Sequence, residues 1–260
     1  MNIYRSISVI VPIALALALT LSACITTTTG DMGATASKSE AARLNMDLGI
    51  SYLRQGEYES ALIKLEKSLQ EEPNNPTAHR ALGLTYERLG ANDKAEKEYR
   101  TAVKQAPQDA DALNQLGVFL CMKGDQSEAM SLFDRAINVP LYQSRYLLYT
   151  NAGKCIKNSD LPLAEDYLRR ALALRDDFPD ALFQMADVAY QRENYLQARA
   201  FIERYQAESQ DSPEVLWLGY RIEMGMENRA GAKVFAESLV RNFPESVETR
   251  MLLEERRNAG

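Results

Sequence analysis

Histidine and cysteine are scarce in this sequence, which has one histidine and three cysteines among 260 residues. So few of these side chains leave little material for a histidine-rich metal site, a cysteine-rich zinc module or histidine-dependent acid–base catalysis. The sequence also lacks a glycine-rich phosphate loop, paired histidines at zinc spacing and a Gly-x-Ser-x-Gly elbow. We therefore expect no catalytic residues, no metal, no cofactor and no small-molecule substrate, and we predict that the chain is not an enzyme.

Glycine, proline and positive charge are also limited. The 13 glycines and 9 prolines are few for an all-β chain, which needs a turn about every eight to twelve residues. We therefore expect a mostly helical protein. The 30 lysines and arginines are outnumbered by 36 aspartates and glutamates, which gives a formal net charge of −6. Because nucleic acids attract basic surfaces, this balance predicts that nucleic acid is not a partner.

Residues 1–23 have the features of a bacterial signal peptide. Arg5 is their only charged residue, and an apolar run from Val9 to Leu21 follows it. That run is shorter than the roughly 20 residues that a permanent membrane-spanning helix needs. We expect the segment to be removed from the mature protein.

The end of this segment, Leu21-Ser22-Ala23-Cys24, is similar to a bacterial lipobox. We predict that Cys24 becomes the lipidated first residue of the mature chain and holds it to a membrane through its acyl chains. The alternative is an ordinary secretory signal with a chance cysteine after the cut. Ile25 stands where an aspartate usually retains lipoproteins in the inner membrane, so resemblance to sorted lipoproteins implies the outer membrane of a Gram-negative bacterium, facing the periplasm. Residues 24–39, rich in Thr, Gly, Ala and Ser, are expected to form a flexible tether.

Small residues recur with a period of about 34 residues along the rest of the chain. Five alanines are separated by 34, 34, 35 and 34 residues, and each follows a glycine or alanine by eleven or twelve residues. Small residues at such spacing fit two antiparallel helices at their closest approach. This pattern resembles the tetratricopeptide repeat, so we predict an all-α, right-handed superhelical solenoid. The alanines are Ala61, Ala95, Ala129, Ala164 and Ala198, and the preceding small residues are Gly49, Gly83, Gly117, Gly153 and Ala186.

The repeats divide the region 40–260 into about six helix pairs and a final cap. In the weaker sixth repeat, Gly231 is expected to take the alanine position. Because glycine weakens a helix relative to alanine, we expect this repeat to be the most mobile. The segment Val139–Tyr142 interrupts the phase between the third and fourth repeats, so the superhelix should bend or widen there. The expected repeats are 42–75, 76–109, 110–145, 146–178, 179–211 and 212–245, with a capping helix at 246–258.

The first helices of the pairs are expected to line the concave side of the superhelix. In repeats one to three, the positions that face away from the helix-pair contact carry apolar residues with arginines beside them. We predict that they form a groove for a partner segment, in which the arginines bind carboxylates. The alternative is that the apolar residues merely thicken the core. The groove residues are Met46, Ile50, Leu53, Arg54, Arg80, Leu84, Glu87, Arg88, Val118 and Met122.

Cys121 and Cys155 are the two thiols that remain after lipidation of Cys24. They are 34 residues apart, one repeat length, on the first helices of adjacent repeats. Since such helices pack side by side, we predict a disulfide between them, which an oxidising periplasm would permit. The alternative is two separately buried thiols, because the phase slip in the join could turn the side chains apart.

Two cysteine-ended segments, Asn114–Cys121 and Tyr149–Cys155, together with the irregular join Val139–Tyr142, are more specific than a generic repeat. With the lipobox and the six repeats, they make the chain similar to the type IV pilus biogenesis and stability lipoproteins, the pilotins of the pilus secretin. The resemblance implies an outer-membrane lipoprotein that binds the secretin subunit and promotes its localisation and multimerisation.

The alternative interpretation is a generic repeat-containing lipoprotein adaptor for cell-wall enzymes or for outer-membrane barrel assembly. Such an adaptor would share the membrane anchor and the repeats, but not the two cysteine-ended segments.

Overall fold

The computed structural model describes the backbone of residues 32–259 and the side chains of residues 38–258. This part of the chain forms thirteen α-helices, and none of them is long and apolar enough to cross a membrane. The predicted signal peptide, residues 1–23, and Cys24, the predicted lipidation site, lie outside the described residues. The helices are α1 (Met32–Gln55), α2 (Tyr58–Glu71), α3 (Pro76–Arg88), α4 (Asn92–Gln105), α5 (Ala110–Lys123), α6 (Gln126–Ile137), α7 (Arg145–Ile156), α8 (Leu161–Leu174), α9 (Pro179–Gln191), α10 (Tyr195–Glu208), α11 (Pro213–Gly225), α12 (Arg229–Asn242) and α13 (Val247–Ala259).

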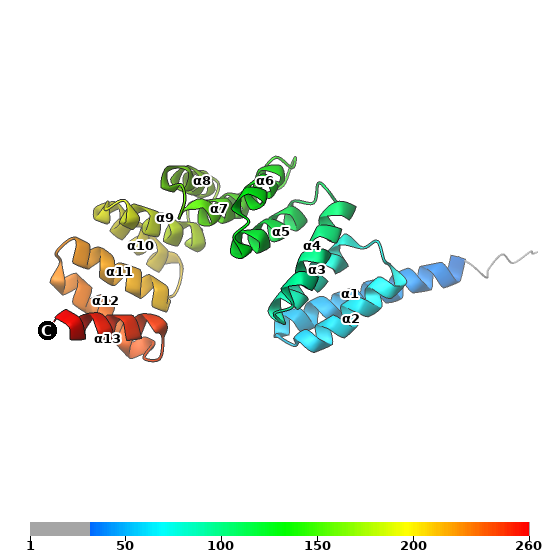
Figure 1. Cartoon of the computed structure of the whole chain (residues 1–260), viewed down its shortest axis with the longest axis horizontal. Helices are drawn as coiled ribbons and strands as arrows, with labels where there is room; N and C mark the ends of the chain where they lie inside the picture. The colour runs from blue at the N-terminus through cyan, green and yellow to red at the C-terminus, as the bar shows by residue number, and fades with distance from the viewer. Residues whose placement is uncertain (1–31, 260) are drawn as a thin grey trace, which may run out of the picture.

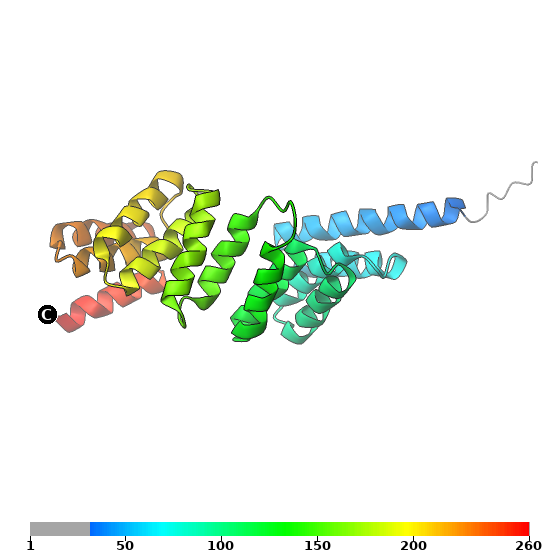
Figure 2. The same cartoon turned by 90° about the horizontal axis from the view of Figure 1, so that it is seen from above.

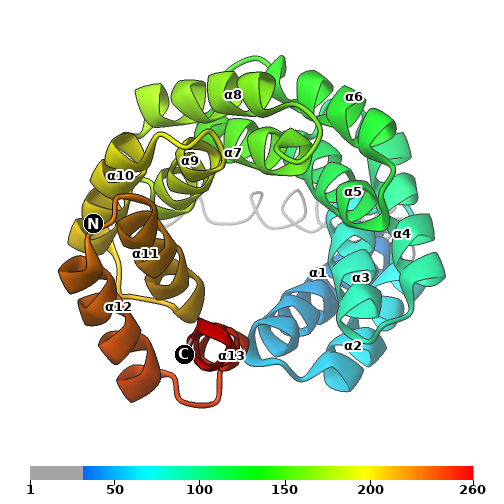
Figure 3. The same cartoon turned by 60° about the vertical axis from the view of Figure 1, so that its left-hand side comes forward.

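The helices pack as successive antiparallel pairs along an elongated superhelix (Figures 1 and 2). The first helices of the pairs, α1, α3, α5, α7, α9 and α11, form an inner ring, and their partners form an outer ring (Figure 3). The last helix, α13, packs against α11 and α12 at the C-terminal end. The predicted fold class, an all-α superhelix of six repeats with a capping helix, is confirmed.

Small residues allow the helices of each pair to approach closely. The five periodic alanines are fully buried. A Cβ atom on Gly83 would lie 2.7 Å from the ring of Tyr99, and one on Gly117 would lie 2.9 Å from the ring of Phe133. Because both rings are buried, there is no room for a larger residue at either glycine.

The first helix begins earlier than expected, which corrects the proposed tether 24–39. Helix α1 starts at Met32 and is 24 residues long, whereas α2 to α13 have 12 to 14 residues. The physical reason is local: after Gly33, residues 34–42 contain no glycine or proline and are rich in alanine, which has the highest helix propensity.

The register of the sixth repeat also differs from the expectation. Ala232 is the fourth residue of α12, as Ala198 is of α10, and it is buried. Ala232, and not Gly231, therefore takes the alanine position. The Gly231 amide donates a hydrogen bond to Asn228 Oδ1 at 3.2 Å, and a Cβ atom on Gly231 would collide with the Glu223 carboxylate. A larger residue at position 231 would therefore push the Glu223 carboxylate away from the hydrogen bonds that it accepts from Arg199 and Asn228.

Candidate functional site

A cavity of about 630 Å³ lies on the inner ring at its N-terminal end. It opens between α1 and α3, with contributions from the start of α2 and from α5. Six of the ten predicted groove residues line it: Ile50, Leu53, Arg54, Arg80, Leu84 and Arg88. Sequence reasoning missed Gln55, Gly56, Tyr58, Thr77, Ala81 and Gln115, which also line it.

The missed residues come mostly from helix ends and from the neighbouring repeat. Tyr58 is the first residue of α2, and Thr77 is the second residue of α3. Gln115 belongs to α5. A register counted along the first helices alone does not include the start of a second helix. The one signal in the sequence that Gln115 could line the groove was its position within the predicted third repeat.

The other four predicted residues lie elsewhere. Met46 packs against the core of the first two repeats, and Val118 packs against the core around Phe133. The Glu87 carboxylate accepts a hydrogen bond from the Tyr99 hydroxyl at 2.7 Å. Met122 is 65% exposed and does not line the cavity.

Two of the six predicted residues that line the cavity also pack against the core. Ile50 packs against the cluster formed by Leu65 and Leu82, and Leu84 packs against the cluster around Phe133. Both side chains are half-buried rather than exposed. Their substitution would therefore disturb the fold as well as the cavity.

Arginines give the cavity a positive charge within an acidic protein. Arg54, Arg80 and Arg88 line it, and within the described part of the chain none of the three forms an ion pair. The Nε atom of Arg80 is buried without a hydrogen-bond partner among the same residues. A buried donor without a partner costs free energy, so this guanidinium is suited to an acceptor supplied by a bound molecule.

Tyr99, on α4 of the second repeat, remains a neutral hydrogen-bond donor. Burial, and then the neighbouring Glu87 carboxylate, raise the pKa of Tyr99. Its hydroxyl keeps its proton at neutral pH and holds Glu87. Glu87 is therefore engaged within the protein rather than free to bind a partner.

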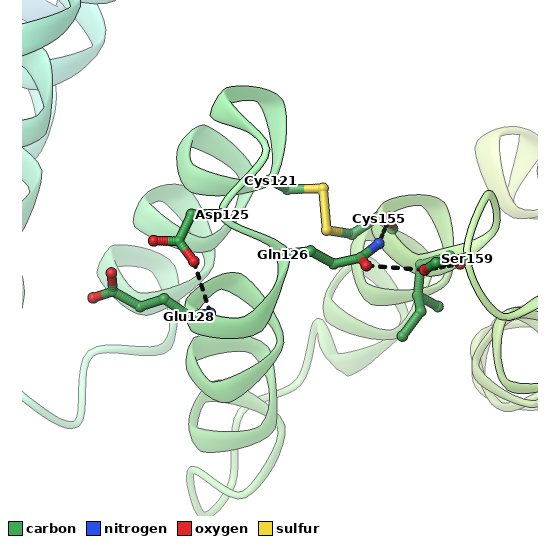
Figure 4. Close-up of a disulfide and its surroundings, with 7 residues drawn as sticks. Cys121, Asp125, Gln126, Glu128, Cys155 and Ser159 are labelled. Atoms are coloured by element: carbon green, nitrogen blue, oxygen red, sulfur yellow. Dashed lines mark hydrogen bonds between the residues drawn. A yellow bond between two sulfur atoms is a disulfide. The ribbon is translucent and has the colours of Figure 1, made fainter.

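A disulfide joins the third and fourth repeats (Figure 4). The sulfurs of Cys121 on α5 and Cys155 on α7 are 2.08 Å apart, and the Cα atoms are 5.8 Å apart. Beside it, the Gln126 side chain donates to the Cys155 carbonyl oxygen at 2.7 Å and accepts from the Ser159 hydroxyl at 2.9 Å. The bond and the amide bridge both fasten α7 to the preceding repeat.

No cluster of three or more metal-ligating side chains occurs among the described residues. The histidine, His79, bonds Glu98 and the Pro73 carbonyl oxygen, and thus links α3 to neighbouring segments. The cavity and its arginines are instead suited to binding a chain segment, with apolar walls and donors for carboxylates.

Comparison with known proteins agrees with the helix pairs. One model of the tetratricopeptide repeat matches residues 33–78, 46–110 and 80–144, and a second matches residues 156–218. The protein is a tetratricopeptide-repeat solenoid, a class whose extended concave surface is typically used to bind other proteins.

Two relatives are similar over most of the chain. The type IV pilus assembly protein PilF of Pseudomonas aeruginosa is 28% identical over 225 residues, 85% of this chain and 89% of the relative. A solved PilF structure has a TM-score of 0.74 and covers 84% of this chain and 99% of its own. The structure of PilW, described as a widely conserved type IV pilus biogenesis factor, has 30% identity and a TM-score of 0.76, and covers 82% of this chain and 98% of its own. The chain belongs to the family of PilF and PilW.

Proposed function

We propose that this chain is an outer-membrane lipoprotein that binds the type IV pilus secretin subunit and promotes its localisation and multimerisation. The observation that carries the proposal is the similarity to PilW and PilF along more than four fifths of the chain. The lipobox Leu21–Cys24 supports the lipid anchor, and the arginine-lined cavity supports a peptide-like partner.

The cavity between α1 and α3 is the proposed secretin-binding site. Apolar side chains of a bound segment would pack on Leu53 and its neighbours, which provides affinity. Carboxylates of the segment would accept hydrogen bonds from Arg54, Arg80 and Arg88, which sets its orientation. An acidic and apolar segment of the secretin subunit is thus the expected ligand.

The anchor is tested by mass spectrometry of the protein purified from membranes. We expect an acylated N-terminal Cys24, and we expect Cys24→Ser to release a folded protein from the membrane fraction. The helix pairs pack through contacts among the described helices α1 to α13, so circular dichroism should not change. An unmodified peptide that spans residues 23 and 24 in the membrane-purified protein would contradict lipidation.

Secretin binding is tested by co-purification from detergent-solubilised membranes. The informative variant is Leu53→Asp with Arg88→Glu, because neither side chain belongs to a core cluster of the described residues. Loss of one leucine buried in the contact costs about 1.5 to 3 kcal/mol of binding free energy. We therefore expect the variant to bind the secretin roughly ten- to a hundredfold more weakly, and less secretin to co-purify with it. Ile50 and Leu84 are unsuitable, since both also pack in the core.

Met122→Asp is the matched control, because Met122 is exposed on the same solenoid but outside the cavity. We expect it to retain the secretin. Normal secretin recovery with the folded Leu53/Arg88 variant would exclude the cavity as the site. Recovery of a cell-wall hydrolase in place of the secretin from the wild-type membranes would contradict the proposed function itself.

A further inference from the structure

The N-terminal end of the solenoid exposes two leucines of α1. Leu44 is 59% exposed and Leu48 is 37% exposed. They stand five residues and one residue before Gly49, the small residue at the close contact with α2. The same two positions precede the small residue in repeats two to five, and every residue at these positions is buried there. These buried equivalents are Ala78 and Leu82, Ala112 and Leu116, Leu148 and Ala152, and Ala181 and Met185.

In repeats two to five, the preceding helix pair covers these positions. Each of the first helices α3, α5, α7 and α9 packs against the second helix of the pair before it. Helix α1 has no described helix pair before it, whereas the C-terminal end of the array is covered by α13. Leu44 and Leu48 therefore belong to an inter-repeat face that nothing in the described part of the chain covers.

The exposed face of α1 has the spacing of a contact between two helices. Ala41, Leu44, Leu48 and Ser51 follow one another at intervals of three, four and three residues. Residues at these intervals share one side of a helix, and two-stranded coiled coils use the same spacing. The two leucines provide apolar contact, and the small residues on either side of them let a second helix approach closely. We call these four residues the α1 seam.

We propose that the α1 seam binds a second copy of this chain, with the two α1 helices side by side and parallel. A two-fold axis along the helices then places each seam leucine against its own copy. The parallel direction rests on the lipid anchor of the proposed function, because a parallel pair places both N-termini at the same end. The leucine contact itself does not depend on the anchor.

The charges beside the α1 seam favour the parallel pair. Glu40 and Asp47, seven residues apart, lie on one flank of the seam, and Lys38 lies on the other. None of the three forms an ion pair among residues 38–258. A two-fold axis along the helices turns the acidic flank of one copy toward the Lys38 flank of the other, whereas an antiparallel pair would bring the two Asp47 carboxylates together. An anionic lipid surface fits this face less well, because it repels the same carboxylates.

The length of α1 also suits this arrangement. Helix α1 has 24 residues and α3 has 13, and the N-terminal part of α1 extends beyond the rest of the first repeat (Figure 2). A second α1 can therefore lie beside it without displacing another helix of the repeat. The seam is smaller than a standard protein interface, but copies anchored in one membrane have a high effective concentration, so a short seam is sufficient to pair them.

Cross-linking in intact cells tests the proposal. Ser51 lies on the α1 seam, so in a parallel pair Ser51→Cys places a thiol opposite its own copy, within reach of a disulfide. Cys121 and Cys155 are already bonded to each other. After mild oxidation, we expect Ser51→Cys to give a covalent dimer on a non-reducing gel, which reductant converts to the monomer. Adding Leu44→Asp and Leu48→Asp should lower the cross-linked fraction by at least about tenfold, because the apolar contact is lost.

Matched variants control for chance collision and for folding. Ser131→Cys should give no dimer, because Ser131 is an exposed serine on the outer helix α6. Leu196→Asp should leave the Ser51→Cys dimer unchanged, because Leu196 is 69% exposed on α10, away from the seam. If circular dichroism shows that the double variant does not fold, Leu44→Asp alone, at the more exposed leucine, should still lower the cross-linked fraction.

Absence of the Ser51→Cys dimer, or an equal cross-linked fraction in a folded variant of the seam leucines, would overturn the proposal. A covalent adduct with a different protein in place of the dimer would also overturn it. Membrane fractionation of the same cells reports separately on the lipid anchor. The dimer should persist in the Leu53→Asp, Arg88→Glu variant, so failure of the proposed secretin site is distinguishable from failure of the α1 seam.

Discussion

At the scale of single residues, His79 shows how one side chain holds two repeats together. Its Nδ1 lies 2.6 Å from Glu98 Oε2 on α4, and its Nε2 lies 2.9 Å from the Pro73 carbonyl oxygen in the turn before α3. Both partners are acceptors, so the protonated imidazole, with two N–H donors, satisfies both. The hydrogen bond to Glu98 raises the pKa of His79, and burial opposes this shift.

The raised pKa predicts a pH-dependent contribution to stability. Since the folded-state pKa exceeds the unfolded value of 6.5, the contribution is fully present below that pH and is lost as pH rises through the folded-state pKa. We expect His79→Gln to lower the free energy of unfolding more at about pH 6 than at about pH 9, with a difference of about 1 kcal/mol. Urea unfolding at both pH values measures it. An equal cost at both would show that the protonated ring is not the stabilising form.

At the scale of elements, the join between the third and fourth repeats is the least regular part of the described solenoid. Helix α6 ends at Ile137 and α7 begins at Arg145. Between them, Leu141 has φ +61° and is 93% exposed, a backbone conformation that is strained for a leucine. The disulfide between α5 and α7 spans this segment, so covalent bonding holds the two repeats in place where the regular helix-to-helix turn is missing.

The disulfide should therefore contribute substantially to stability. For a sequence separation of 34 residues, the chain-entropy model gives about 3 to 4 kcal/mol. We expect Cys121→Ser with Cys155→Ser to lower the free energy of unfolding by about that amount, and reductant to have the same effect on the wild type but none on the variant. Urea denaturation measures both. Two free thiols in the denatured, unreduced wild-type protein would show that the bond does not form in solution.

At the scale of the whole molecule, stability is transmitted only between neighbours. Each described helix contacts helices at most two positions away along the chain. The solenoid therefore behaves as a linear array, whose end needs a cap to cover the last apolar face. Helix α13 provides this cap, with Leu252 fully buried against the cluster of Leu216, Tyr220 and Leu239.

Adjacent leucines of α13 allow a direct test of the cap. Leu252→Ala should lower the free energy of unfolding by about 2 to 5 kcal/mol, because it leaves a cavity at the end of the array. Leu253, next to it, is 51% exposed, so Leu253→Ala should change stability by no more than about 0.5 kcal/mol. Urea unfolding of both variants checks this. Equal effects would mean that α13 does not cap the array as the structure indicates.

The repeat architecture was predictable because close helix contacts demand small residues at a fixed period. Gly83 and Gly117 sit where neighbouring aromatic rings leave no space for a Cβ atom, and such a constraint is visible in the sequence alone. The one-repeat spacing of Cys121 and Cys155 is a signal of the same kind, since equivalent positions on adjacent helices lie side by side. Six of the cavity residues, among them Arg54, Arg80 and Arg88, followed from the same register.

Contacts between repeats were decided only by the tertiary structure. Whether Met46 and Val118 face the core or the cavity depends on how far each helix pair is rotated against the next, and the period does not contain that rotation. The register of Ala232 depends on where α12 begins, directly after its N-cap residue Asn228. Tyr190 and Arg221 lie on different helices, 31 positions apart, and they meet because packing of α9 against α11 brings those two faces together.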